Sequence, residues 1–382
     1  MLKFIRLVLA CALAISLSVP AVAYAQLPCQ QGQLGGQLIL ICIPPNWNGV
    51  LVVYAHGYVA PQAPLMLPLG ELTLPDGTFV PAVLLSQGFA FATSSYSKNG
   101  YAVEQAGNDL NALVAHFKTL VAPFPVLGVL ATGASEGGII TTMLVERFPG
   151  TYAGGLALCG PVGGMPFQVE YLGDFRVVFD AFFEEVFPFG TVDVPPDAFQ
   201  DWETRYIPAI RRAIQTRPHK VRQLLDVTGA AVDPLDPIRS AVTTAVDVLA
   251  YSIFGTNDLI ATADGNPYDN QVTGYQGSKN DVALNARVER VTGDPLGQLY
   301  ISNFYQTTGA LQRPLVTLHN TLDPVVPFAH EAIYTGLVAS AGSSAFLITV
   351  PVVRYGHCNF TGPELVAAFA LLVQQATAQI GP

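Results

Sequence analysis

The chain has 382 residues and a formal net charge of −10, with 12% charged and 51% hydrophobic residues. An acidic chain without a basic patch is a poor candidate for binding nucleic acid, so no partner of that kind is expected. The length and the hydrophobic fraction are sufficient for a large buried core.

The first 25 residues have the pattern of an export signal. Lys3 and Arg6 precede an apolar run from Leu7 to Val19, and Ala23-Tyr24-Ala25 supplies small residues for cleavage. The run is too short to span a membrane, and no later run of 18 uninterrupted apolar residues follows. The mature chain is therefore expected to have no membrane span and to be secreted or periplasmic.

Buried strands and amphipathic helices alternate in the first half of the mature chain. We expect strands at 49–55, 88–93, 125–132 and 152–158, and helices at 102–121 and 136–148. This alternation predicts an α/β fold with a mostly parallel central sheet and helices on both faces.

The pattern becomes helical and irregular after Gly163-Gly164 and returns to strands near residue 314. Helices are expected at 168–187, 197–216, 220–227 and 238–254, then a strand, helix, strand and helix at 314–319, 329–341, 346–353 and 362–378. The predicted organisation is a signal peptide (1–25), a first core part (26–164), a helical cap insertion (165–298) and a second core part (299–382). Most aromatic residues of 167–189 are interpreted as the core of the insertion itself, and the polar stretch 264–270 as a turn rather than a cation site.

A serine stands where the third expected strand meets a helix, in Thr132-Gly133-Ala134-Ser135-Glu136-Gly137-Gly138, the only G-x-S-x-G of the chain. In a turn this tight, the serine takes a strained conformation, and the flanking glycines let the strand and the helix approach each other. The alternative is an ordinary glycine-rich turn.

In this context the chain resembles the α/β-hydrolases, over about residues 45–165 and 299–382. The resemblance implies a nucleophile, an acid and a histidine in that order along the chain. It assigns these roles to Ser135, to Asp323 after the strand 314–319, and to His357 after the strand 346–353. It also implies an oxyanion hole from the backbone N–H groups of Tyr58, in His56-Gly57-Tyr58, and of Glu136.

Some alternatives stay open for these residues. Asp323 is also compatible with the mere start of a proline turn. His116 and His219 are expected at the surface. His319 and His330 lie near the acid loop, where a structural role is favoured over a place in the pocket.

Four cysteines follow the expected signal: Cys29, Cys42, Cys159 and Cys358. An even number in an exported chain favours two disulfides. Cys29 and Cys42 flank a glycine turn between two short strands, so a local pair is the simplest choice, and it leaves Cys159 with Cys358.

The position of Cys358 directly after His357 has three interpretations: a thiol nucleophile, a metal site, or a disulfide beside the base. The serine turn makes a thiol nucleophile redundant, and no C-x-x-C or H-x-x-x-H spacing supports a metal. A disulfide that restrains the loop of His357 is favoured.

Together these features predict a secreted serine hydrolase that cleaves carboxylic esters, of a small molecule or a polymer, through an acyl-enzyme intermediate. Neither a metal nor an organic cofactor is expected. A serine peptidase or aminopeptidase of the same fold is the alternative, and a non-catalytic binding protein is a third hypothesis.

Overall fold

The computed structural model describes residues 27–380, so the expected signal peptide lies outside the described residues. Within them one sheet contains β1 (Cys29–Leu34), β2 (Gln37–Cys42), β3 (Val50–Ala55), β4 (Ala90–Ser94), β5 (Gly128–Ala134), β6 (Gly154–Leu158), β7 (Leu315–Leu322) and β8 (Leu347–Tyr355). The order across the sheet is β1-β2-β4-β3-β5-β6-β7-β8. The pairs from β4 to β8 are parallel, while β2 pairs antiparallel with β1 and β4. The predicted, mostly parallel sheet is confirmed.

Helices cover both faces of this sheet, because successive strand residues point to opposite sides. The helices packed on it are α2 (Val80–Ser86), α3 (Val103–Val121), α4 (Glu136–Arg147), α12 (Ala329–Ser340) and α13 (Gly362–Ile380). Leu51 and Val53 belong to the core shared with α3, α4 and α12. Val52 and Tyr54 belong to the core shared with α2 and α13.

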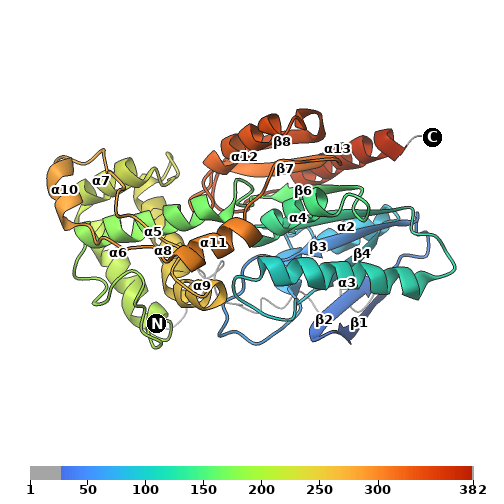
Figure 1. Cartoon of the computed structure of the whole chain (residues 1–382), viewed down its shortest axis with the longest axis horizontal. Helices are drawn as coiled ribbons and strands as arrows, with labels where there is room; N and C mark the ends of the chain where they lie inside the picture. Colours follow the sequence, from blue (N-terminus) through green and yellow to red (C-terminus); the bar gives the residue numbers. More distant parts are fainter. Residues whose placement is uncertain (1–26, 381–382) are drawn as a thin grey trace, which may run out of the picture.

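A group of helices between β6 and β7 extends beyond one end of the sheet (Figure 1). We call it the cap; it contains α5 (Met165–Phe182), α6 (Ile207–Thr216), α7 (Pro218–Thr228), α8 (Pro237–Phe254), α9 (Thr256–Ala263), α10 (Asp281–Arg287) and α11 (Pro295–Phe304). Three shorter helical segments lie between these elements: η1 (Leu69–Leu72), η2 (Trp202–Tyr206) and η3 (Ser344–Phe346). The division of the chain into domains stays a prediction, and the boundary expected at residue 298 falls inside α11.

Aromatic side chains pack against one another inside the cap, as predicted for most aromatic residues of 167–189, and their cluster is continuous with one core of the sheet. Phe175, Phe179 and Phe183 are fully buried, and the ring centroids of Phe179 and Phe183 are 4.9 Å apart. The fully buried Arg176 binds Asp180 Oδ2 at 2.7 Å and lies 4.2 Å from the ring centroid of Phe187. A buried cation needs such partners, so Arg176 joins α5 to the loop that follows it.

Several element boundaries differ from those expected. The helix predicted at 197–216 is a short π-helical turn followed by α6, whose Pro208 occupies the first turn, where the lack of an N–H costs nothing. The short helices α2, α9, α10 and α11 were not predicted, because seven to ten residues carry little periodic signal. Among residues 27–380, no helix is long and apolar enough to cross a membrane.

Candidate active site

Ser135 is the single residue between β5 and α4, and its backbone is strained. Its φ of 57° and ψ of −122° lie outside the regions that side chains favour. A Cβ on Gly133 would lie 2.3 Å from the carbonyl oxygen of Gly137, and one on Gly137 would lie 2.0 Å from that of Ala55. The two glycines therefore permit the close approach of strand and helix, as the sequence predicts, and the turn presents the Ser135 side chain at the carboxyl edge of the sheet.

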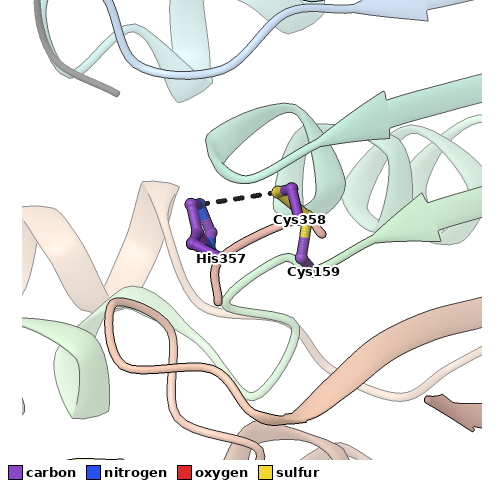
Figure 2. A group of neighbouring side chains, drawn as sticks. All are labelled: Cys159, His357 and Cys358. Carbon is purple, nitrogen blue, oxygen red and sulfur yellow. Dashed lines mark hydrogen bonds between the residues drawn. A yellow bond between two sulfur atoms is a disulfide. The ribbon is translucent and has the colours of Figure 1, made fainter. Parts of the chain in front are cut away.

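A disulfide adjoins the second predicted site residue, His357, in the loop after β8 (Figure 2). Cys358 is joined to Cys159, which directly follows β6, and a second disulfide joins Cys29 to Cys42. Both pairings agree with the prediction. Cys159, His357 and Cys358 form a cluster of metal-ligand type, but a disulfide offers no thiolate to a metal.

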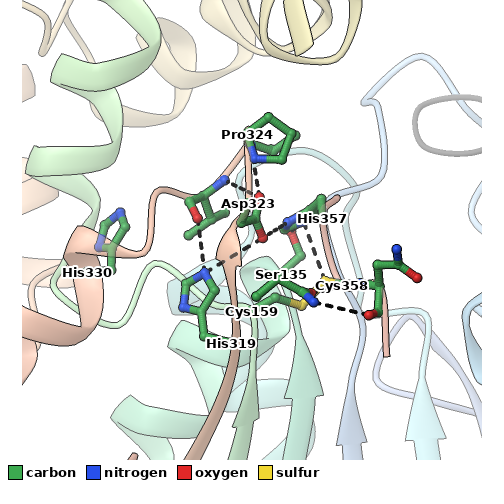
Figure 3. A network of polar contacts seen from close by, with 12 residues as sticks. Ser135, Cys159, His319, Asp323, Pro324, His330, His357 and Cys358 are labelled. Atoms are coloured by element: carbon green, nitrogen blue, oxygen red, sulfur yellow. Dashed lines mark hydrogen bonds and ion pairs between the residues drawn. A yellow bond between two sulfur atoms is a disulfide. The ribbon is translucent and has the colours of Figure 1, made fainter. Parts of the chain in front are cut away.

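Ser135, His357 and Asp323 form a continuous hydrogen-bonded chain (Figure 3). Ser135 Oγ lies 2.8 Å from His357 Nε2, and His357 Nδ1 lies 2.7 Å from Asp323 Oδ2. Because a carboxylate only accepts, Nδ1 carries the hydrogen and Nε2 is free to accept the hydroxyl hydrogen. The three residues predicted to act together are thus in contact, although they come from three loops.

Asp323 is held by hydrogen bonds within the loop after β7, and this loop is held in turn by the cap. Its Oδ1 accepts hydrogen bonds from the backbone N–H groups of Val325 and Val326, at 2.9 and 3.0 Å. Tyr171 and Gln168 of the cap helix α5 donate to the carbonyl oxygens of Pro324 and Val325, at 2.6 and 2.8 Å. The cap is therefore bonded directly to the loop that carries the acid, a contact that the sequence did not indicate.

His319 lies beneath the acid loop, fully buried. Its Nδ1 is 3.0 Å from Glu331 Oε1 and its Nε2 is 3.0 Å from the carbonyl oxygen of Val326, with Asp323 Oδ2 at 3.7 Å. Both ring nitrogens face groups that only accept, so both carry hydrogen and the ring is an imidazolium. The structural role expected for His319 thus includes a fixed positive charge beside the acid.

The pKa values of this cluster follow from its charges. Burial by itself would raise the pKa of Asp323, but the adjacent imidazoles of His357 and His319 lower it to about 2. Burial would lower the pKa of His319, but the carboxylates of Asp323 and Glu331 raise it to about 9. Asp323 is therefore an anion at neutral pH and can stabilise a protonated His357.

His330 has the structural role that was favoured for it. Its Nδ1 accepts from the N–H of Gly163 at 3.2 Å, and its Nε2 donates to Gln168 Oε1 at 2.9 Å. Burial, and then the charge of His319, lowers the pKa of His330 to about 3, so the ring is neutral. It anchors the cap residue that in turn binds the acid loop. His116 and His219 are exposed, as expected.

A cavity of about 340 Å³, which includes space open to solvent, adjoins Ser135, and the two predicted oxyanion residues Tyr58 and Glu136 line it. Gly57 packs against Ser135, since a Cβ on Gly57 would lie 3.4 Å from Ser135 Cβ. The N–H of Gly57 donates to Glu71 Oε2 at 2.9 Å, so it is already engaged. The hydroxyl of Tyr58 donates to the carbonyl oxygen of Phe254 in the cap, at 3.1 Å.

The side chain of Glu136 is a buried carboxyl on the residue that follows Ser135. Its Oε1 accepts from the N–H of Ala102 at 3.0 Å, while its Oε2 has no hydrogen-bond partner among the described residues. Burial raises the pKa of Glu136 to about 8, so this carboxyl is neutral at pH 7. Sequence reasoning assigned a role to the backbone of Glu136 and gave no indication of a neutral side chain.

Helix α8 places a second carboxyl, that of Asp247, near His357. Thr244, Asp247 and Tyr251 share one side of α8, at spacings of three and four residues. Thr244 Oγ1 is 2.9 Å from the Tyr355 hydroxyl, and Tyr251 lines the cavity of Ser135. Asp247 is close enough to His357 and Asp323 for their charges to affect it, and burial raises its pKa to about 7. Nothing in the sequence indicated this carboxyl, because helix packing decides which side of α8 faces the site.

No protein-family model matches the chain, and no curated protein matches it in sequence. Solved structures do. An esterase and feruloyl esterase B, both from Aspergillus oryzae, superpose with TM-scores of 0.51 and 0.50 at 14% identity. They cover 91% and 92% of this chain, which covers 78% and 80% of theirs. The chain thus has the α/β-hydrolase fold.

An acylaminoacyl peptidase also matches, with a TM-score of 0.46 and 9% identity over 93% of this chain. This chain spans only 42% of the length of that peptidase.

Proposed function

We propose that the protein is an exported serine hydrolase that cleaves carboxylic esters through an acyl-enzyme intermediate. The observation that carries the proposal is the chain of hydrogen bonds from Ser135 through His357 to Asp323, with distances of 2.8 and 2.7 Å. A serine hydroxyl becomes a useful nucleophile when an adjacent, oriented base takes its proton.

In the proposed reaction, Ser135 Oγ attacks the ester carbonyl carbon while its proton passes to His357 Nε2. The imidazolium that forms is stabilised by Asp323, which also fixes the tautomer through Nδ1. The same Nε2–H then protonates the departing alcohol oxygen, and the acyl group stays on Ser135. A water molecule, deprotonated by His357, attacks the acyl-enzyme and releases the acid.

Negative charge develops on the carbonyl oxygen during both attacks. The backbone N–H of Glu136, at the first turn of α4, and that of Tyr58 are the proposed donors. Support comes from the packing of Gly57 against Ser135, which brings the 56–58 turn to the nucleophile. The N-terminal end of α4 adds a favourable dipole at the same place.

Export is proposed on two grounds. The expected signal at 1–25 provides an address, and disulfides of the kind seen at Cys29–Cys42 and Cys159–Cys358 persist in oxidising compartments. No step of the proposed reaction uses a metal or an organic cofactor.

The test is a panel of 4-nitrophenyl esters assayed with the mature protein, its Ser135→Ala variant and a fluorophosphonate probe. We expect ester hydrolysis and labelling by the wild type, and loss of both in Ser135→Ala. Alanine 4-nitroanilide is included because a peptidase of the same fold would cleave it.

Turnover of the anilide without turnover of any ester would replace the proposal by the peptidase alternative. Absence of labelling in folded protein would instead favour a binding protein. Thr141→Ala on α4 serves as the control, because it removes a buried hydroxyl of the same helix that has no hydrogen-bond partner among residues 27–380.

A further inference from the structure

Two cavities adjoin each other between the cap and the sheet. The first is lined in part by Ser135, and the second, of about 450 Å³ including space open to solvent, is lined largely by residues of α5, α8 and α9. We call the second the cap chamber. Tyr101, Leu172 and Tyr251 line both cavities and so form the boundary between them. A substrate group too long for the first cavity meets the cap chamber next.

The cap chamber has an uncharged lining, with no acidic or basic side chain among the described residues that form it. Three of its polar side chains already have protein partners: Thr191 with Glu289, Ser252 with Arg176, and Asn266 with Tyr268. Val169, Leu172, Leu259 and Ile260 supply apolar surface. Because unpaired polar or charged groups are costly to bury, this lining favours an apolar occupant.

The first cavity does not impose a charge on that occupant. Glu136 is the only acidic or basic side chain among the described residues that line it, and burial keeps this carboxyl neutral at pH 7. The charge of Lys98 acts on Glu136, but Lys98 lines neither cavity and donates to Thr262 Oγ1 at 3.1 Å. An uncharged chain therefore encounters no unpaired charge between Ser135 and the cap chamber.

The position of His357 indicates which half of the ester, acyl or alcohol, faces the cap chamber. The departing alcohol must lie beside His357 Nε2, which protonates it. Val325 and Val326, on the acid loop that binds His357, line the first cavity but not the cap chamber. The chamber instead continues from Tyr101, whose neighbour Ala102 binds Glu136 on the oxyanion side of Ser135. The acyl half of the ester therefore points toward the cap chamber.

We propose that the cap chamber binds the acyl chain of the substrate, and that the enzyme prefers esters of uncharged apolar acids long enough to pass Tyr101, Leu172 and Tyr251. This inference rests on the proposed ester hydrolysis and names its substrate class.

The experiment compares two ester series with Val192→Trp, which fills the chamber from a partly exposed loop position. The first series varies the acid (4-nitrophenyl acetate, hexanoate, decanoate), and the second varies the alcohol (methyl, hexyl and decyl acetate). The readout is the ratio of kcat/KM between the longest and shortest member. We expect the acyl ratio to fall about tenfold or more in Val192→Trp, because excluded methylenes lose their burial. The alcohol ratio should change less than twofold.

Val282→Trp is the matched control, since it makes the same substitution on α10 at a position that is 83% exposed and lines neither cavity. Ile260→Trp fills the chamber from α9 and guards against a local effect at residue 192. Acyl ratios that stay unchanged in both chamber variants, or a fall confined to the alcohol series, would overturn the inference while leaving ester hydrolysis standing. A wild type that hydrolyses no ester in either series would overturn the proposed function and this inference with it.

Discussion

The two disulfides should differ in how much each stabilises the protein. One adjoins His357 and the other links the strands of a hairpin, and each can be removed separately. The paired variants are Cys159→Ala with Cys358→Ala, and Cys29→Ala with Cys42→Ala. They are well matched, because each pair contains one fully buried and one partly exposed cysteine. The lost side-chain packing is therefore similar, and the length of the closed loop is the main difference.

The expected magnitudes follow from loop closure in the unfolded chain. Cys159 and Cys358 are separated by 199 residues, and Cys29 and Cys42 by 13. Chain entropy then gives about 5 kcal/mol for the long loop and about 3 kcal/mol for the short one. The long-range pair should cost about 2 kcal/mol more, and this difference is more secure than either value, because the packing losses largely cancel.

The assay is urea unfolding at pH 7, with the free energy of unfolding extrapolated to zero denaturant. A short-loop variant that is destabilised as much as the long-loop variant would refute the reasoning. Activity should also respond differently, since Cys358 adjoins the base. Asn359 and Asn320 exchange two hydrogen bonds, at 2.9 and 3.1 Å, that still hold this loop. For the variant without the Cys159–Cys358 disulfide, we therefore expect kcat to fall by less than roughly 100-fold, the loss expected when the base is misplaced by about 1 Å.

Four further substitutions test the charges of the site and of the cap. Asp323→Asn should lower kcat by about 10⁴-fold, because the wrong tautomer of the base is favoured; steady-state kinetics on a 4-nitrophenyl ester measures it, and a drop below tenfold would contradict the role of Asp323. His319 has a folded-state pKa of about 9, above its ordinary 6.5, so its contribution to stability is full below pH 6.5 and is lost as the pH rises through 9. His319→Gln should remove that dependence from urea-unfolding free energies measured across this range. Glu136 should act in the same direction over a lower pH range: the unfolded chain releases its proton near pH 4.5 and the folded chain near 8, so stability falls as the pH rises between these values, and Glu136→Gln should flatten the fall. Arg176→Met should lower the free energy of unfolding by about 3 kcal/mol, because it leaves the Asp180 carboxylate without its buried partner. This value is at the lower end for a broken buried ion pair, since the Asp180 side chain is 22% exposed. Adding Asp180→Leu should restore the free energy of unfolding.

The sequence was sufficient for the central part of the sheet because the strands there are buried on both faces. Val50–Ala55 and Gly128–Ala134 are continuous apolar or small-residue runs, and such runs need no tertiary information to be recognised. The cap was harder to predict. Its helices pack mainly on one another, so the pattern of α8 indicates a helix but not which side covers Ser135.

The same limit explains what was found and what was missed in the site. Ser135 is marked by local constraints, since only glycine fits at positions 133 and 137. The neutral state of Glu136 and the charged state of His319 depend on burial and on partners distant in sequence, such as Ala102 and Glu331. No pattern within a short window carries that information.

The charges around the base provide a further argument for its role. At rest the buried cluster contains the carboxylates of Asp323 and Glu331 and the imidazolium of His319, a net charge of −1 shared among groups in mutual contact. When His357 takes the proton of Ser135, it adds one positive charge 2.7 Å from Asp323, and the cluster becomes neutral. The positive charge that forms on the imidazole during the reaction is therefore compensated by the adjacent carboxylate of Asp323. Without the positive charge of His319, the resting cluster would carry −2, and Asp323 would tend to take up the proton itself. His319 is therefore expected to keep Asp323 a carboxylate while leaving one negative charge available to the base.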